Sequence, residues 1–414
     1  MNLSPLLYID PGTGSALFSI LIGAAATLYF LSRALIIKLK VVLSGGKAAK
    51  ETSAVYPYVI YCEGKQYWNV FKPVLEEFEN RQIAICYFTS AKDDPVFDLT
   101  WNFVKPEFIG EGNKAFARLN FLHADLCLMT TPGLDVYQLK RSKMTGHYAH
   151  VLHAPVVATT YRLFGLDYFD SVLLTGNYQA EDLKTLENQR NIPKKQLVTV
   201  GCTYLDEYAA KIKNIPKEEN HPFTVLLSPS WGSSALLSRY GEKLLDPLVN
   251  TGYRIIVRPH PQSKKSETEV LEKLASRYKE KIIWDYESDN IYSLSKADIM
   301  ISDFSGIVYD YVFLMDKPVI YVKQGLDIRA YDADDLGENA VDRLWLFRTL
   351  SAIGIELKEE QFETIGEVIK NASDSELLKE ARKKAREEAW QFPGEAGKRI
   401  ADFIIETVKH DHSH

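Results

Sequence analysis

The chain has 414 residues and a formal net charge of -6, with 46% hydrophobic and 25% charged residues. This is the balance of an ordinary globular protein with room for two or three domains, and it gives no indication of nucleic-acid binding. The four cysteines are scattered without a CxxC pair or metal-ligand spacing, which favours reduced thiols in a cytosolic body over a disulfide framework.

The first 45 residues differ from the rest of the chain. Residues 11–32 carry no charge, and a helix of 22 residues is long enough to cross the hydrocarbon of a bilayer. Positive charges follow this stretch, so the positive-inside rule places the body of the protein in the cytoplasm. Residues 34–43 continue the apolar run and could lie in the membrane interface. A buried helix of a soluble domain is the alternative, but a polar face is missing. We predict a single-pass helix in the cell membrane.

Apolar runs alternate with amphipathic stretches after a polar linker at 46–54. A strand at 56–64 is followed by a helix at 67–81 and a second strand at 82–90. Further short apolar runs end in Gly133 and Gly176. This β-α-β order is typical of a parallel sheet covered by helices.

A second series of alternating elements begins near residue 222, after a charged connection with two prolines. The whole pattern predicts two Rossmann-like doubly wound α/β domains behind the transmembrane helix. We place the domain boundaries at 1–45 for the anchor, 46–218 and 219–372 for the two α/β domains, and 373–414 for a C-terminal amphipathic helix and tail.

Three loops of the second half carry polar residues at predicted carboxyl ends of strands, where open parallel sheets bind their ligands. His260 stands between two prolines that stiffen the backbone. Ser305 and Gly306 open a helix, whose free N–H groups favour a phosphate, while Asp303 suits a cap or an orienting group. Together the loops predict a pyrophosphate site, with a rigid turn and ordinary capping as the alternatives. The candidate residues are Ser228, Ser230, Arg258, His260, Asp303, Ser305 and Gly306.

The motifs "SPSW", "RPHPQ" and "SKADIMISDFSGIVYDYVFLMDKPVIYV" resemble, in this order and spacing, the donor domain of the CDP-glycerol glycerophosphotransferase family. Its members are teichoic-acid primases and polymerases with a GT-B fold. The resemblance covers about residues 145–330 and is strongest in the last motif. This chain has Phe304 for the usual Tyr, Gly306 for the second Ser, and Gly232 where the family often has Arg.

The resemblance also implies a catalytic base in the first α/β domain, which would then be the acceptor domain. Family members carry a His-Gly-Thr-Pro-like loop, and His153 in "HAP" takes the place of its histidine. His147 and His150 precede it at intervals of three, which on a helix would place them near one face, so a metal site is the alternative. Which of the three is the base stays open. We predict no metal and no cofactor, with a CDP-alditol as donor substrate.

The function implied is a membrane-associated transferase. It would move glycerol phosphate, or a related alditol phosphate, from a CDP-alditol to a hydroxyl of a lipid-linked or cell-surface polymer precursor and release CMP. A neutral imidazole at His153 would take the acceptor proton, while His260, Arg258 and Ser305 would stabilise the phosphoryl charge. The alternatives are a GT-B glycosyltransferase or epimerase that uses a nucleotide sugar, and a non-catalytic polymer-binding membrane protein. The sequence leaves open the alditol, the acceptor, the choice between primase and polymerase, the metal dependence and the oligomeric state.

Overall fold

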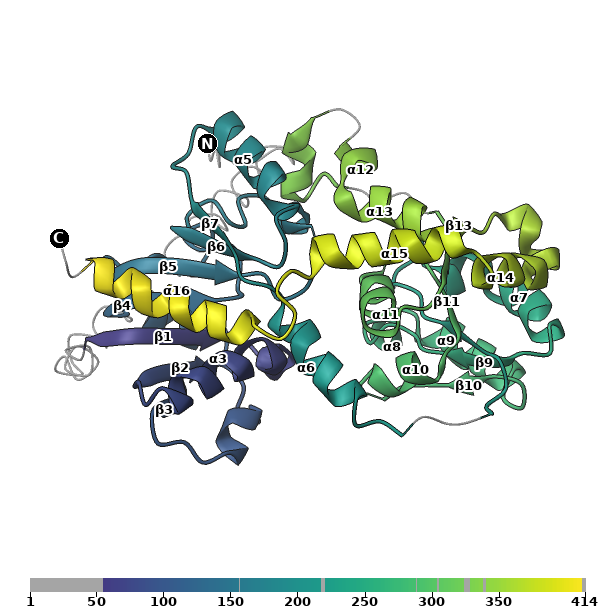
Figure 1. The fold of residues 1–414 in the computed structure, drawn as a ribbon, viewed down its shortest axis with the longest axis horizontal. Helices are drawn as coiled ribbons and strands as arrows, with labels where there is room; N and C mark the ends of the chain where they lie inside the picture. Colours follow the sequence, from purple (N-terminus) through teal and green to yellow (C-terminus); the bar gives the residue numbers. More distant parts are fainter. Residues whose placement is uncertain are drawn as a thin grey trace, which may run out of the picture. The chain divides into compact units, whose positions relative to one another are not determined.

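Two parallel β-sheets organise the part of the chain that the structure describes (Figure 1). This computed structural model describes residues 55–411, except 156, 217–219, 288, 304, 324–327 and 338–339. The apolar runs of the sequence form buried strands in both sheets, and the strands pair in parallel with their neighbours. The prediction of two doubly wound α/β halves is therefore confirmed.

The first sheet has the strand order β3-β2-β1-β4-β5-β6-β7, so the direction of winding reverses between β1 and β4. Helix α3 covers one face because its apolar residues recur at helical spacing and are buried. The strands are β1 (Tyr56–Cys62), β2 (Ile85–Thr89), β3 (Val104–Phe108), β4 (Ala124–Met129), β5 (Thr145–Val151), β6 (Ser171–Leu174) and β7 (Gln196–Thr199). The helices include α3 (Trp68–Asn80), α4 (Asn113–Leu119), η4 (Ala158–Thr160), α5 (Gln179–Arg190) and α6 (Thr203–Ile212).

The second sheet has the order β10-β9-β8-β11-β12-β13 and reverses between β8 and β11. Its strands are β8 (Thr224–Leu227), β9 (Arg254–Val257), β10 (Ile283–Trp284), β11 (Ile299–Ser302), β12 (Val319–Tyr321) and β13 (Gly354–Glu356). The helices that accompany it include α7 (Leu236–Asn250), α8 (Ser263–Ser266), α9 (Thr268–Arg277), α10 (Ile291–Lys296), α11 (Ile307–Met315), η5 (Asp332–Leu336), α12 (Ala340–Arg343), α13 (Trp345–Ile353) and α14 (Ile365–Ser373).

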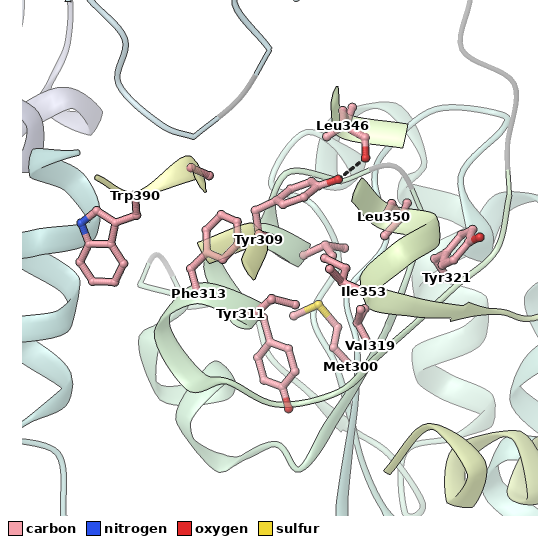
Figure 2. Packing of buried hydrophobic residues seen from close by; sticks show 14 of the residues in the cluster. Met300, Tyr309, Tyr311, Phe313, Val319, Tyr321, Leu346, Leu350, Ile353 and Trp390 are labelled. Carbon is pink, nitrogen blue, oxygen red and sulfur yellow. Dashed lines mark hydrogen bonds between the residues drawn. The ribbon is translucent and has the colours of Figure 1, made fainter. Parts of the chain in front are cut away.

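Helix α11 is held by a core rich in aromatic side chains (Figure 2). Tyr309 and Phe313 pack against Trp345 of α13, with ring centroids 5.3 and 6.5 Å away. The Tyr309 hydroxyl donates a hydrogen bond to the carbonyl of Leu346, the dashed line in Figure 2. This packing fixes the start of α11 beyond the carboxyl end of β11.

The C-terminal segment supplies a helix to each half of the molecule (Figure 1). Helix α15 (Glu376–Ala389) packs against α11 and α13, and α16 (Ala396–Asp411) packs against α3 and β4. Between them, the Trp390 indole N–H and the Gly394 N–H both donate to Asp206 Oδ1 of α6, at 2.9 and 2.7 Å. The tail at 412–414 lies outside the described residues. The boundaries that we placed at 46–218, 219–372 and 373–414 stay a prediction.

The predicted fold class needs a correction at its N-terminus, because it included a transmembrane helix. Within residues 55–411, apart from the short gaps named above, the structure contains no helix long and apolar enough to span a bilayer. The longest helix there, α16, has 16 residues and carries charges, while a span needs about 20 predominantly apolar residues. The stretch 11–32, on which the prediction rested, lies outside the described residues. The supported fold class is the pair of α/β sheets alone.

Candidate active site

The loops that follow β8, β9 and β11 meet at one edge of the second sheet. These three strands are neighbours in the order β9-β8-β11, and the winding reverses between β8 and β11. Ser228, directly after β8, donates its N–H to the carbonyl of Ile301 at 3.0 Å and its hydroxyl to the carbonyl of Arg258 at 3.3 Å. The structure therefore brings the three predicted loops together at the place where doubly wound sheets bind ligands.

Asp303 ties two of these loops to each other. Its side chain has no exposed surface, and it accepts hydrogen bonds from the Ser230 N–H and hydroxyl at 2.9 and 2.8 Å. It also accepts from the Leu236 N–H at 3.4 Å and from the Ser305 N–H. Burial raises the pKa of Asp303 above its usual value, although these hydrogen bonds oppose the shift. Asp303 and Ser230 thus serve the architecture of the site more than direct contact with a ligand.

His260 is oriented by its own loop. Its Nδ1 accepts a hydrogen bond from the Gln262 N–H at 3.1 Å, so the neutral ring carries its proton on Nε2. Burial lowers the pKa of His260, while the charges of Glu267 and Asp303 act in the opposite direction. The half-exposed Trp231 ring lies 6.3 Å away, centroid to centroid. His260 therefore presents a neutral N–H donor beside an accessible aromatic surface.

Glu267, between α8 and α9, is a residue of this edge that the sequence analysis missed. It accepts hydrogen bonds from the Gly232 N–H at 2.9 Å and from the Ser266 hydroxyl at 2.6 Å. Gly232 has a φ of 97°, a backbone conformation that favours glycine. Glu267 falls inside a charged stretch of the sequence without a motif, so nothing marked it as a support for the β8 loop.

Arg258 is turned toward the loop after β10. Its Nη1 donates to Asp285 Oδ2 at 2.5 Å and its Nη2 donates to the carbonyl of Glu287 at 2.8 Å. Both charged side chains of this pair are nearly buried. Much of the hydrogen-bonding capacity of Arg258 serves these two contacts. The contact between Arg258 and a pyrophosphate stays a prediction. Asp285 was also missed, since only the order of strands reveals that β10 lies beside β9.

The start of α11 is exposed at Gly306. Ser305 is partly buried, whereas Gly306 is exposed at the N-cap position. A Cβ added to Gly306 would meet no atom within 4 Å. The positive pole of the helix dipole lies at this exposed end, which favours an anion.

One turn along α11, Asp310 meets α6. The Tyr204 hydroxyl donates to Asp310 Oδ2 at 3.0 Å. Burial raises the pKa of Asp310 to about 7, although this hydrogen bond opposes the shift. A carboxyl group that titrates near neutral pH therefore lies one helical turn from Gly306.

The three histidines that the sequence analysis singled out, His147, His150 and His153, do not form one metal site. His147 and His150 belong to strand β5 and not to a helix, and their side chains lie on opposite faces of the sheet. The ring of His147 packs against Phe403 of α16, and the ring of His150 packs against Phe169. His153 follows the strand. In the described part of the chain there is no group of three or more His, Cys, Asp or Glu side chains that could hold a metal ion.

His153 lies among aromatic side chains. Its Nδ1 is 3.4 Å from the Tyr161 hydroxyl, and its ring packs edge-on against Tyr67 at 5.3 Å. Burial lowers the pKa of His153, which keeps the imidazole neutral at pH 7. The base role that the resemblance implied for His153 stays a prediction.

Tyr161 also lines a pocket of about 500 Å³ that the sequence did not reveal. Glu63 and Thr131, which follow β1 and β4, form part of its wall, and the Thr131 hydroxyl donates to Glu63 Oε2 at 3.1 Å. The exposed Arg162 lines it too, and no carboxylate partner of its guanidinium occurs among the described residues. This pocket lies at the winding reversal of the first sheet, the place where doubly wound sheets bind ligands.

Comparisons with known proteins identify a family and related folds. The profile of a family described as CDP-Glycerol:Poly(glycerophosphate) glycerophosphotransferase matches residues 174–406, more than half of the chain. The match includes all three loops of the second sheet and most of its helices. A comparison with curated protein sequences gave no match.

Solved structures share the fold at low sequence identity. The wall teichoic acid polymerase TagF aligns with a TM-score of 0.52 and 16% identity, over 86% of this chain and 90% of TagF. A putative UDP-N-acetylglucosamine 2-epimerase from Listeria monocytogenes aligns with a TM-score of 0.56 and 12% identity, over 86% of this chain and 98% of the epimerase. The UDP-GlcNAc 2-epimerase of Methanocaldococcus jannaschii aligns with a TM-score of 0.53 and 15% identity, over 85% of this chain and 100% of the epimerase. These similarities support the GT-B type of fold.

Proposed function

Because the chain belongs to the CDP-glycerol:poly(glycerophosphate) glycerophosphotransferase family, we propose that it transfers glycerol phosphate from CDP-glycerol to an acceptor hydroxyl and releases CMP. The family makes it a glycerophosphotransferase-type enzyme of teichoic-acid synthesis. In the proposed step, the acceptor oxygen bonds to the phosphorus that carries glycerol. The bond from that phosphorus to the bridging oxygen breaks, and CMP leaves.

The convergence of the loops after β8, β9 and β11 is the observation that carries this proposal. Asp303 joins the β8 loop to the start of α11, and His260 presents a neutral N–H from the β9 loop. The open space at Gly306 would receive the pyrophosphate at the helix N-terminus. Ser305 and His260 would then stabilise the charge on the phosphoryl oxygens with donors that are already in place.

We assign the acceptor to the carboxyl edge of the first sheet. The pocket there offers a carboxylate at Glu63 for hydroxyl groups and the guanidinium of Arg162 for a phosphate, which suits a polyol phosphate chain. His153, beyond β5, would contact the attacking hydroxyl or the transferred phosphoryl group. In this proposal the acceptor is a lipid-linked polymer precursor, so the reaction takes place at the membrane surface, with the body on the cytoplasmic side where CDP-activated donors are available.

We also propose that CDP-glycerol is a substrate and that the enzyme needs no resident cofactor or metal. The donors at Ser305, His260 and the N-terminus of α11 would supply the charge stabilisation that a metal gives in many phosphoryl transferases. Turnover that persists after treatment with EDTA would support this part of the proposal, and turnover restored only by added Mg²⁺ would refute it.

A nucleotide-sugar enzyme is the second candidate, because the epimerase structures share the fold. One experiment separates the two. The purified chain is incubated with CDP-glycerol, CDP-ribitol or UDP-GlcNAc and a polyol phosphate acceptor, and released nucleotides are measured. We expect CMP from CDP-glycerol and no change in UDP-GlcNAc. Consumption of UDP-GlcNAc with CDP-glycerol left intact would refute the proposal.

A further inference from the structure

The Tyr161 hydroxyl lies between two histidines of the first half. Its oxygen is 3.3 Å from His150 Nε2 and 3.4 Å from His153 Nδ1. Burial raises the pKa of Tyr161, so the hydroxyl keeps its proton. A tyrosine hydroxyl has one proton, and it can therefore donate to only one of the two nitrogens and must accept from the other. The position of one proton in this chain of three side chains sets the positions of the others.

His150 determines the direction of the chain. Its side chain is fully buried, with the rings of Tyr161 and Phe169 packed edge-on at 5.4 and 5.1 Å. Burial, with a smaller contribution from His153, lowers the pKa of His150 to about 3, so the ring is neutral and carries a single proton.

The other ring nitrogen of His150, Nδ1, has no hydrogen-bond partner among the described residues. Buried N–H groups without an acceptor are rarer in proteins than acceptors without a donor. The proton of His150 therefore belongs on Nε2, from which it is donated to the Tyr161 oxygen.

We propose that Tyr161 donates its own proton to His153 Nδ1 and so holds His153 in the tautomer that carries its proton on Nε2. His153 then offers an N–H group to a ligand, and not a lone pair. This inference rests on the proposed function, and it changes the part that His153 plays there. His153 donates a hydrogen bond to the phosphoryl group or the acceptor oxygen, and Tyr161 is the positioning residue behind it.

A donor suits this reaction. The transition state of phosphoryl transfer is loose in most analyses, and its charge spreads over the phosphoryl oxygens, so catalysis depends mainly on positioning and electrostatic stabilisation. As the acceptor oxygen bonds to phosphorus, the bridging bond breaks and CMP leaves with its electron pair, while the proton of the acceptor passes to water, directly or through a phosphoryl oxygen. No side chain has to hold that proton, and an N–H donor at His153 stabilises the oxygens throughout.

Substitution of His153 separates a donor from a base. The amide of His153→Gln can donate a hydrogen bond but cannot act as a base at neutral pH, and His153→Ala can do neither. If His153 is a donor, turnover by His153→Gln should exceed that by His153→Ala by about 10-fold or more, the value of one hydrogen bond to a charged group. Equal, very low turnover in both variants would overturn the donor role and leave the transferase itself intact. If the unaltered chain releases no CMP from CDP-glycerol, the proposed function fails instead.

The tautomer itself can be observed without any substrate. In the full chain labelled with ¹⁵N histidine, two-bond ¹H–¹⁵N correlation spectra distinguish protonated from unprotonated ring nitrogens, and His153→Gln identifies the signals of His153. We expect a protonated Nε2 and an unprotonated Nδ1, and a mixture of tautomers in Tyr161→Phe. Tyr67→Phe is the matched control, because Tyr67 packs on the same ring edge-on. A protonated Nδ1 in the unaltered chain would overturn the inference.

Discussion

The carboxyl edges of the two sheets are built in different ways. At the edge of the second sheet, residues far apart in the chain are bonded directly: Ser230 lies 73 positions from Asp303, and the two share two hydrogen bonds. At the edge of the first sheet, His153 interacts with a tyrosine only eight positions away, through a single contact of 3.4 Å. The edge of the second sheet is therefore held by buried contacts between distant loops, whereas the position of His153 at the first edge depends on one local chain of hydrogen bonds.

This difference separates two ways of making a site. Buried polar contacts such as those of Asp303 are costly to break, so they hold the loops in one arrangement before any ligand arrives. A local chain such as His150–Tyr161–His153 sets the position of a proton and joins no distant loops. Substitution of Asp303 should accordingly affect both stability and donor binding, whereas His153→Gln should affect the chemistry with little change in stability.

Asp303→Ala should have the largest effect and should break the rigid edge. The substitution leaves the buried N–H groups of Ser230 and Leu236 without their acceptor, at roughly 1–3 kcal/mol each, so we expect a loss of about 4 kcal/mol in the free energy of unfolding. CDP-glycerol binding should be lost with it. Urea denaturation and calorimetric titration measure the two quantities. Asp374→Ala, on an exposed carboxylate after α14, is the control. Unchanged stability in Asp303→Ala would show that the loops do not depend on this side chain.

The same contrast explains what could be predicted from the sequence. Apolar runs in the sequence marked strands β1, β8, β9 and β11. The polar loops after β8, β9 and β11 could be recognised because their polar residues directly follow these runs in the chain. Strand β5 was not predicted, because Gly146 and two histidines interrupt its apolar pattern.

Hydrogen-bond partners that are brought together by the order of the strands could not be predicted from the sequence either. The pairing of Arg258 with Asp285 requires β10 to lie beside β9, and the support from Glu267 requires a turn that the sequence shows only as a charged stretch. The pocket at Glu63 and Arg162 is formed by loops that carry no motif. The helix α16 was also missed, although its contacts with α3 help to cover the first sheet.

Asp310→Asn tests the contact between α11, which begins at the edge of the second sheet, and α6. The pKa of Asp310 in the folded protein is about 7, above the ordinary 3.8, so the folded state binds its proton more tightly than the unfolded state does. The protonated Asp310 therefore contributes to the free energy of unfolding in full below pH ~3.8, and this contribution is lost as the pH rises through about 7. The loss approaches about 4 kcal/mol if the shift is expressed in full.

The asparagine variant has no charge to bury, and Tyr204 can still donate to its amide oxygen. We therefore expect Asp310→Asn to be more stable than the unaltered chain at pH 8 and to show a flatter dependence of stability on pH between 4 and 8. Denaturation at several pH values measures this. Asp374→Asn changes the same charge on an exposed residue and should follow the unaltered chain. An Asp310→Asn protein that is less stable at pH 8 would contradict the prediction.

His260→Ala should weaken donor binding without unfolding the second sheet. The side chain contributes one N–H donor to the proposed pyrophosphate site, and a hydrogen bond to a charged group is worth about 1.5–3 kcal/mol, or roughly 10- to 150-fold in affinity. Calorimetric titration with CDP-glycerol measures the change, and thermal denaturation should show little shift. His123→Ala, before β4 in the first half, removes a similar side chain and should bind normally. Normal affinity in His260→Ala would place the donor elsewhere.

The smallest effect, and the most selective, should come from Gly306→Ala. Gly306 has helical backbone angles, φ −59° and ψ −22°, and a methyl group there would meet no protein atom within 4 Å, so the fold tolerates it. If the pyrophosphate approaches the backbone at this point, the methyl group would occupy its space, and the KM for CDP-glycerol should rise several-fold while stability stays the same. Gly366→Ala in α14 makes the same change on a helix of the same half, and it should leave the KM unaltered. A KM that responds equally in both variants, or in neither, would mean that the open space at Gly306 is not where the donor phosphates bind.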